Sequence, residues 1–122
     1  MTLPIVTNPA PVASWNADNL DINGNLVPAG EISGYMVGIR DLAATGSAVG
    51  TYPNTASTNA TTVAEALSLL YTSGAMVAGH DYAVAVKTLA ATPPGPSAWS
   101  AEYQFTWQPI AAPAAPTGLT VA

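Results

Sequence analysis

The chain has 122 residues, of which 49% are hydrophobic and only 7% are charged, and its formal net charge is −5. This length predicts one domain, and the scarcity of cations excludes a phosphate-binding surface, so neither nucleic acid nor an anionic membrane is an expected partner. Cysteine is absent and there is one histidine, so we expect no disulfide framework, no zinc site and no cofactor.

The start of the chain has no basic region and no long apolar stretch, so we expect no cleaved export signal. No run approaches the roughly 18 apolar residues that a membrane span requires. The low charge has two explanations that stay open. One is an inert, Ala-rich module, and the other is a surface buried in an assembly, since charged residues are depleted at interface cores.

Proline and glycine are spread along the chain with short apolar runs between them, which is typical of several short strands joined by turns. In chain order, a short strand is expected at 11–15, with Trp15 facing the core. A polar stretch follows at 16–31, with Asn23-Gly24 as its strongest turn.

The clearest strand of the first half is expected at 32–40, where period-two alternation puts Tyr35 and Val37 on one face. A weak edge strand is expected at 47–52. A polar loop is expected at 54–62.

The segment 62–71 fits two structures. Thr62 and Glu65 have the spacing of a capping box, and a helical face with Gly74 as its end would hold Val63, Leu67 and Leu70. Alternation fits a strand less well, because Glu65 would point inward. The local pattern favours a short helix and the strand-rich surroundings favour a strand, so both stay open.

The second half contains two further alternating segments, 82–89 and 97–107. Aromatic side chains dominate the inward face of the later one, and each large ring buries on the order of 150–250 Å². The core residues expected from these two segments are Tyr82, Val84, Val86, Tyr103, Phe105 and Trp107.

These segments carry short motifs in a fixed order. Trp15 ends one strand, 32–37 has the sequence Ile-Ser-Gly-Tyr-Met-Val, and 97–100 has the sequence Ser-Ala-Trp-Ser. Between them a strand is entered through Gly79, followed by Tyr82, Val84 and Val86. In this order the motifs resemble those of a fibronectin type III domain, a member of the immunoglobulin-like β-sandwiches.

The resemblance covers 11–107 and implies an all-β fold, an antiparallel sandwich in which the hydroxyl of Tyr82 bonds back to the backbone. It divides the chain into an arm or first strand at 1–9, a domain at 10–108 and an Ala/Pro-rich tail at 109–122. The chain departs from the family's pattern in two long segments, at 16–31 and 54–74.

The tail ends in a strand-like stretch whose alternating residues are Thr117, Leu119 and Val121. It resembles the first strand of another such domain. Three interpretations stay open: a remnant of a tandem array, a disordered tail, or a strand that pairs with a sheet edge and joins subunits.

Candidates for chemistry are few. His80 is expected in a turn, and no nucleophile or carboxylate is placed beside it by the sequence, so we expect no enzyme. One loop gathers oxygen ligands suited to calcium without the spacing of a hand loop: Asp18, Asp21, Asn23, Asn25 and Glu31. Trp99 is the one ring expected to be exposed for sugar stacking.

The sequence therefore favours a structural assembly protein. The most concrete form is a bacteriophage virion component, a capsid decoration or tail accessory protein, assembled in the bacterial cytoplasm as an oligomer or on a shell protein. The alternative is an extracellular spacer or carbohydrate-adhering module of a secreted enzyme or adhesin. Both are analogies from the fold.

Overall fold

The computed structural model describes residues 2–17, 20–28, 30–91 and 95–122. This part of the chain is nearly all-β, with seven strands and one turn of 3₁₀ helix. In chain order they are β1 (Ile5–Val6), β2 (Val12–Ser14), β3 (Ile32–Asp41), β4 (Asn54–Asn59), β5 (Ala64–Ala66), η1 (Leu67–Leu70), β6 (Asp81–Ala90) and β7 (Tyr103–Trp107). No helix in the described ranges has the length and hydropathy needed to cross a membrane.

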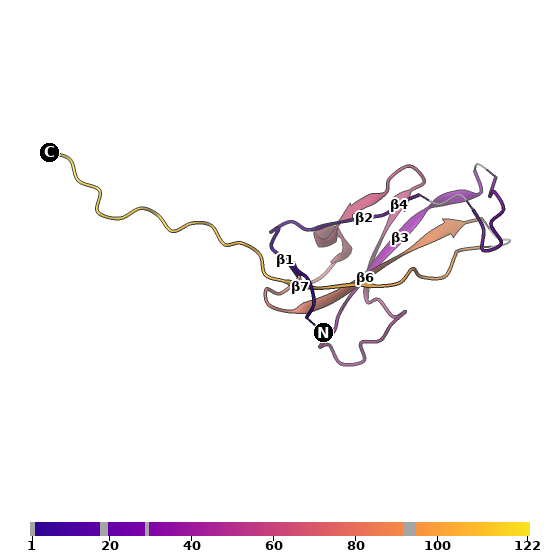
Figure 1. Cartoon of the computed structure of the whole chain (residues 1–122), viewed down its shortest axis with the longest axis horizontal. Coiled ribbons are helices and arrows are strands. Elements are labelled where there is room, and N and C mark those ends of the chain that lie inside the picture. Colours follow the sequence, from indigo (N-terminus) through magenta and orange to yellow (C-terminus); the bar gives the residue numbers. More distant parts are fainter. Residues whose placement is uncertain (1, 18–19, 29, 92–94) are drawn as a thin grey trace.

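The strands form two sheets (Figure 1). One has five strands in the order β1-β7-β6-β3-β4, and the other has two, β2 and β5. The long strands β3 and β6 form the middle of the larger sheet, pairing Val37 with Val86 and Ile39 with Val84. The smaller sheet and η1 cover one face of the larger sheet, so the core lies between them.

The prediction of antiparallel pairing throughout was wrong for β1, which runs parallel to β7. Parallel neighbours need a long crossover, and here nearly the whole domain separates the two strands. Backbone bonds continue beyond the paired residues, since the N–H of Ile110 donates to the carbonyl oxygen of Thr7 at 2.9 Å.

The edge strand of the larger sheet lies later in the chain than predicted. Residues 47–52 contain only an isolated bridge between Ala48 and Thr51. The strand is β4, in the segment predicted as a polar loop, and it pairs with β3 over six residues. Its two Thr residues favour a strand, but its Asn and Ala residues are depleted in strands, so the backbone of β3 decides this pairing more than the local sequence does.

The ambiguous segment 62–71 contains both a strand and a helical turn. β5 pairs Glu65 with Ala13 of β2, and the 3₁₀ turn η1 then buries Leu67 and Leu70. The predicted capping box does not form, because Ala66 precedes η1 and the hydroxyl of Thr62 donates to the side-chain oxygen of Asn59. Pairing with β2 therefore overrides the helical pattern.

The inward faces of β3, β6 and β7 supply the core, and all its fully packed members come from these strands or from η1. The buried cluster is Val37, Ile39, Leu67, Leu70, Tyr82, Val84 and Phe105, with Trp15, Val86 and Trp107 packed against it. Tyr35 is also buried and meets Trp15 edge to face, with ring centroids 5.6 Å apart.

Tyr103 was predicted to be in the core and is not. Its side chain is 59% exposed, although it lies only two residues from buried Phe105. It lines an open cleft between the sheets, so its side chain lies on the predicted inward face, but no strand or helix of the described ranges covers it there.

One local feature, at Tyr82, matches a detail that the resemblance implied, and a second feature, at Ser97 and Ser100, was not predicted. The hydroxyl of Tyr82 accepts the N–H of Val77 at 2.6 Å. The hydroxyls of Ser97 and Ser100 accept the N–H groups of Thr88 and Val86 in β6, at 2.8 and 3.0 Å. These serines therefore replace backbone acceptors beside β6, so β7 as a regular strand begins only at Tyr103.

Candidate interaction site

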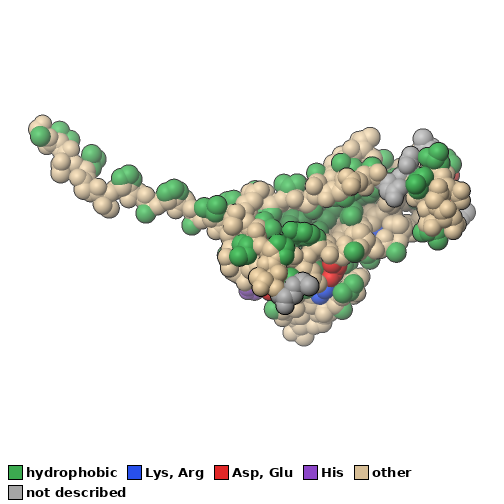
Figure 2. All heavy atoms as spheres, viewed as in Figure 1, with side chains coloured by type: hydrophobic (Ala, Val, Ile, Leu, Met, Phe, Trp, Pro, Cys, Tyr) green, Lys and Arg blue, Asp and Glu red, His purple; other side chains and the backbone are tan. Residues whose placement is uncertain are grey.

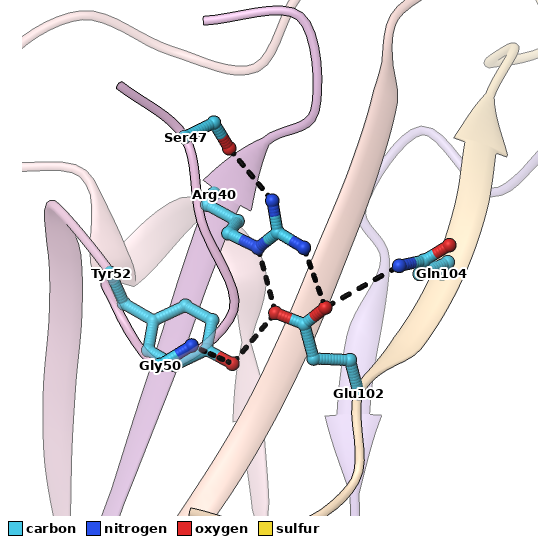
Figure 3. A network of polar contacts seen from close by, with 6 residues as sticks. All are labelled: Arg40, Ser47, Gly50, Tyr52, Glu102 and Gln104. Atoms are coloured by element: carbon cyan, nitrogen blue, oxygen red, sulfur yellow. Dashed lines mark hydrogen bonds and ion pairs between the residues drawn. The ribbon is translucent and has the colours of Figure 1, made fainter. Parts of the chain in front are cut away.

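The outer face of the larger sheet carries a buried polar cluster that the sequence did not predict. It consists of Arg40, Ser47, Tyr52, Glu102 and Gln104 (Figure 3). Small residues make room for it. Ala83 and Ala85 are buried in β6, and a Cβ on Gly38 would lie 2.6 Å from Tyr52. Arg40, the only arginine of the chain, is therefore buried on the outer face of β3.

The ion pair at the centre of this cluster is bidentate. The guanidinium Nε and Nη2 of Arg40 donate to the two carboxylate oxygens of Glu102, both at 2.7 Å, and the two side chains are only 8% and 6% exposed. The hydroxyl of Tyr52 donates to the same carboxylate at 2.7 Å. Each charge is thus matched and hydrogen-bonded, which a buried pair requires.

This pairing predicts a loss of stability in acid. Hydrogen bonds from Arg40, opposed by burial, lower the pKa of Glu102 from 4.5 to about 2. A depressed carboxyl pKa gives stability that is complete above the unfolded pKa and is lost as pH falls through the folded one. We expect Glu102 to contribute roughly 3 kcal/mol, lost between about pH 4.5 and pH 2. Urea unfolding at a series of pH values measures it.

A Glu102→Gln variant is the control for that titration, because it cannot lose a proton at this position. Its deficit relative to the natural chain should shrink as the pH approaches 2. A deficit that stays constant from pH 7 to pH 2 would contradict the assignment. Backbone donors at Asn25 and Asn23 also lower the pKa of Asp21, but the variant retains that carboxyl, so its effect cancels.

Trp99, the ring expected to be exposed, is half-buried. The ammonium of Lys87 lies 4.7 Å from its ring centroid, and Tyr52 meets it edge-on with centroids 4.6 Å apart. A sugar that stacks on the ring face used by Lys87 would have to displace a cation–π contact. The carbohydrate alternative therefore gains no support here.

His80 has a partner that the sequence analysis missed. Its Nδ1 lies 2.6 Å from a carboxylate oxygen of Asp41, 39 residues earlier. The register explains this, because Asp41 pairs with Tyr82 at the start of β6. The side chains are 44% and 24% exposed, so the pair is a surface contact of small expected stability. In the described ranges no hydroxyl bonds to the other imidazole nitrogen, Nε2.

The predicted calcium loop is organised by a turn. One carboxylate oxygen of Asp21 accepts the N–H groups of Asn23 and Asn25, at 2.8 and 2.9 Å. Glu31 lies at the entry to β3, where its carbonyl accepts the N–H of Ala91. Asp18 lies outside the described residues. Among the residues described, no group of three or more His, Cys, Asp or Glu side chains could hold a metal ion.

An apolar cleft with a volume of about 560 Å³ lies between the two sheets. Hydrophobic side chains gather on this face of the domain (Figure 2). β2 forms one wall, and the segment 100–105 with β6 forms the other. No charged residue is among its described lining residues. Six predicted core residues line it: Trp15, Val37, Val84, Val86, Tyr103 and Phe105.

The predicted assembly tail does not reach this cleft. Residues 111–122 form no strand and extend away from the domain (Figure 1). Thr117 is exposed, and Leu119 and Val121 are 91% and 95% exposed. The structure thus brings six of the nine predicted core residues together at an open cleft and leaves the predicted tail residues apart from it.

Comparison with known proteins identifies no relative, since no family model, curated protein or solved structure matches this chain.

Proposed function

We propose that this protein is a non-enzymatic structural protein that works by surface docking and self-association. The observation that carries the proposal is the nature of its surface. Twelve large hydrophobic side chains are exposed in the described ranges, whereas the whole chain has only two basic and seven acidic residues. Part of this apolar surface is gathered at the cleft, whose lining includes the exposed side chains of Val12 and Tyr103, and a contiguous apolar surface of this kind marks an interaction site.

The fold that supports this role is an immunoglobulin-like sandwich of the fibronectin type III type. The arguments for it are the two facing sheets, the Tyr82 hydroxyl bond to Val77 and the two serine hydroxyls beside β6. Sheet edges and loops on a rigid scaffold are the parts of such a fold that bind partners. A bacteriophage virion component, a capsid decoration or tail accessory protein, is the form of assembly protein that a small, nearly uncharged module suits best.

Sedimentation of the full-length chain tests self-association. We expect the mass to rise with protein concentration. We also expect the association to survive high salt, because apolar contacts are not screened as ion pairs are. A monomer at all concentrations would contradict this proposal, and an oligomer that dissociates in salt would contradict its apolar basis.

A further inference from the structure

One edge of β2 has no strand partner within the described chain. The N–H of Trp15 donates to Val63, and the carbonyl of Pro11 accepts the N–H of Leu67. These bonds and the pairing of Ala13 with Glu65 show that residues 11, 13 and 15 point their backbone N–H and C=O groups toward β5. In an antiparallel pair the alternate residues point their backbone groups the other way. Val12 and Ser14 therefore direct theirs toward the open edge.

This open edge borders the apolar cleft. The first strand cannot cover it, because β1 is two residues long and pairs with β7 instead. Val12 is 56% exposed and Tyr103 is 59% exposed, one on each side of the opening. The site therefore offers backbone hydrogen-bond donors and acceptors beside the apolar cleft. An added strand would bond to the backbone groups of the edge and also fill the cleft with its side chains, whereas a compact apolar ligand would only fill the cleft.

The chain itself carries a segment with the matching properties. Residues 109–122 contain no charged side chain, and the described lining of the cleft contains none either. Leu119 and Val121 share one face of an extended strand, as side chains two residues apart do. Both are almost fully exposed, so burial would stabilise them without desolvating a charge.

The tail is better placed to reach a second molecule than to fold back. Its start is held beside β1 by the bond from Ile110 to Thr7, and from there the chain leads away from the domain (Figure 1). To return, it would have to reverse within 111–116. Pro113 and Pro116 lie in that segment, and proline biases its own and the preceding residue toward extended backbone.

We propose that residues 117–121 of one copy add as a strand to the open edge of β2 in a second copy, with Leu119 and Val121 in the cleft. Donor and acceptor are different surfaces, so the contact either closes, as a reciprocal pair or a larger ring, or continues as a filament. This inference rests on the proposed function and specifies how self-association occurs.

Disulfide trapping in full-length chains tests it, because the natural sequence has no cysteine. Copies carrying Thr120→Cys are mixed with copies carrying Ser14→Cys or Val12→Cys, which together sample two registers on the outward side of β2. Cross-strand neighbours lie about 4.5–5.5 Å apart, within the range that a disulfide spans. Copies carrying Ser57→Cys, an exposed position on the edge strand β4, are the matched control.

We expect disulfide-linked mixed dimers with Ser14→Cys or Val12→Cys and none above background with Ser57→Cys. Equal trapping at Ser57, or trapping there alone, overturns the proposal. A chain carrying both Ser14→Cys and Thr120→Cys that closes only on itself, as a monomer at every concentration, also overturns it, because the strand then pairs in cis.

A second measurement separates this contact from self-association in general. The double substitution Leu119→Asp and Val121→Asp should weaken association by roughly a hundredfold or more, since two apolar side chains lose their burial. Ile22→Asp, at a fully exposed loop position, should leave it unchanged. If the chain associates and the tail substitutions have no effect, the tail contact is wrong and the assembly role stands. If the natural chain never associates, the assembly role itself fails.

Discussion

Replacing Glu102 with Gln is expected to lower the free energy of unfolding by about 3–5 kcal/mol, because it leaves the buried guanidinium of Arg40 without a counter-charge. The amide of Gln would also turn a donor toward a group that has only donors. Small domains are stable by roughly 5–15 kcal/mol, so this single change removes a large share of the total. Urea unfolding at pH 7 measures the loss.

The matched control is Glu65→Gln, which removes the same charge from β5. In the described chain the side chain of Glu65 forms no hydrogen bond or ion pair, so its loss should cost well under about 1 kcal/mol. A cost at Glu102 no larger than the cost at Glu65 would show that the bidentate pair does not stabilise the fold.

A double-mutant cycle shows whether the cost comes from the pair or from its breakage. Arg40→Met alone leaves the Glu102 carboxylate buried and unpaired, and Glu102→Leu alone leaves the guanidinium unpaired, so each should destabilise the fold at least as strongly as Glu102→Gln. The double variant Arg40→Met with Glu102→Leu should be more stable than either single variant, since replacing both charges with apolar groups of similar size is often neutral. A double variant that loses the sum of the single effects would contradict coupling.

Phe105→Ala is expected to cost about 3–5 kcal/mol, whereas Tyr103→Ala should cost under about 1 kcal/mol in the monomer. Phe105 is 3% exposed and belongs to the buried cluster, while Tyr103 is 59% exposed in the open cleft. The two aromatic residues lie on the same strand and the same face, so they form a matched pair. Thermal or urea unfolding at low protein concentration compares them.

Equal losses at the two positions would mean that the cleft is closed in the folded monomer and that Tyr103 belongs to the core. The same variants carry information on assembly. If a neighbouring tail fills the cleft, Tyr103→Ala should weaken association more than it weakens the fold. Phe105→Ala should lower the free energy of unfolding more than it weakens association.

The sequence by itself determined that this is an all-β domain and which faces of its long strands point inward. Alternation with period two is a local property, so Tyr35, Val37, Val84 and Phe105 could be assigned to the inward face without knowledge of any partner strand. The bond of the Tyr82 hydroxyl to the backbone was expected only from the resemblance to fibronectin type III domains, and its partner, the N–H of Val77, was not predicted.

The tertiary structure alone decided what covers each face. Tyr103 has the same alternation as Phe105, yet its burial depends on whether a strand lies across the cleft, and β1 pairs with β7 instead. β4 likewise forms from polar residues because β3 offers it a backbone edge.

Arg40 and Glu102, 62 residues apart, illustrate why the central site escaped prediction. Alternation put Arg40 on the outer face, where a charged residue is expected to meet water. Only the register of β3, β6 and β7, with small residues between the two charges and Tyr52 over Gly38, turns that position into a buried pair. Residue types fix which faces are apolar, and pairing between distant strands fixes which groups on those faces become partners.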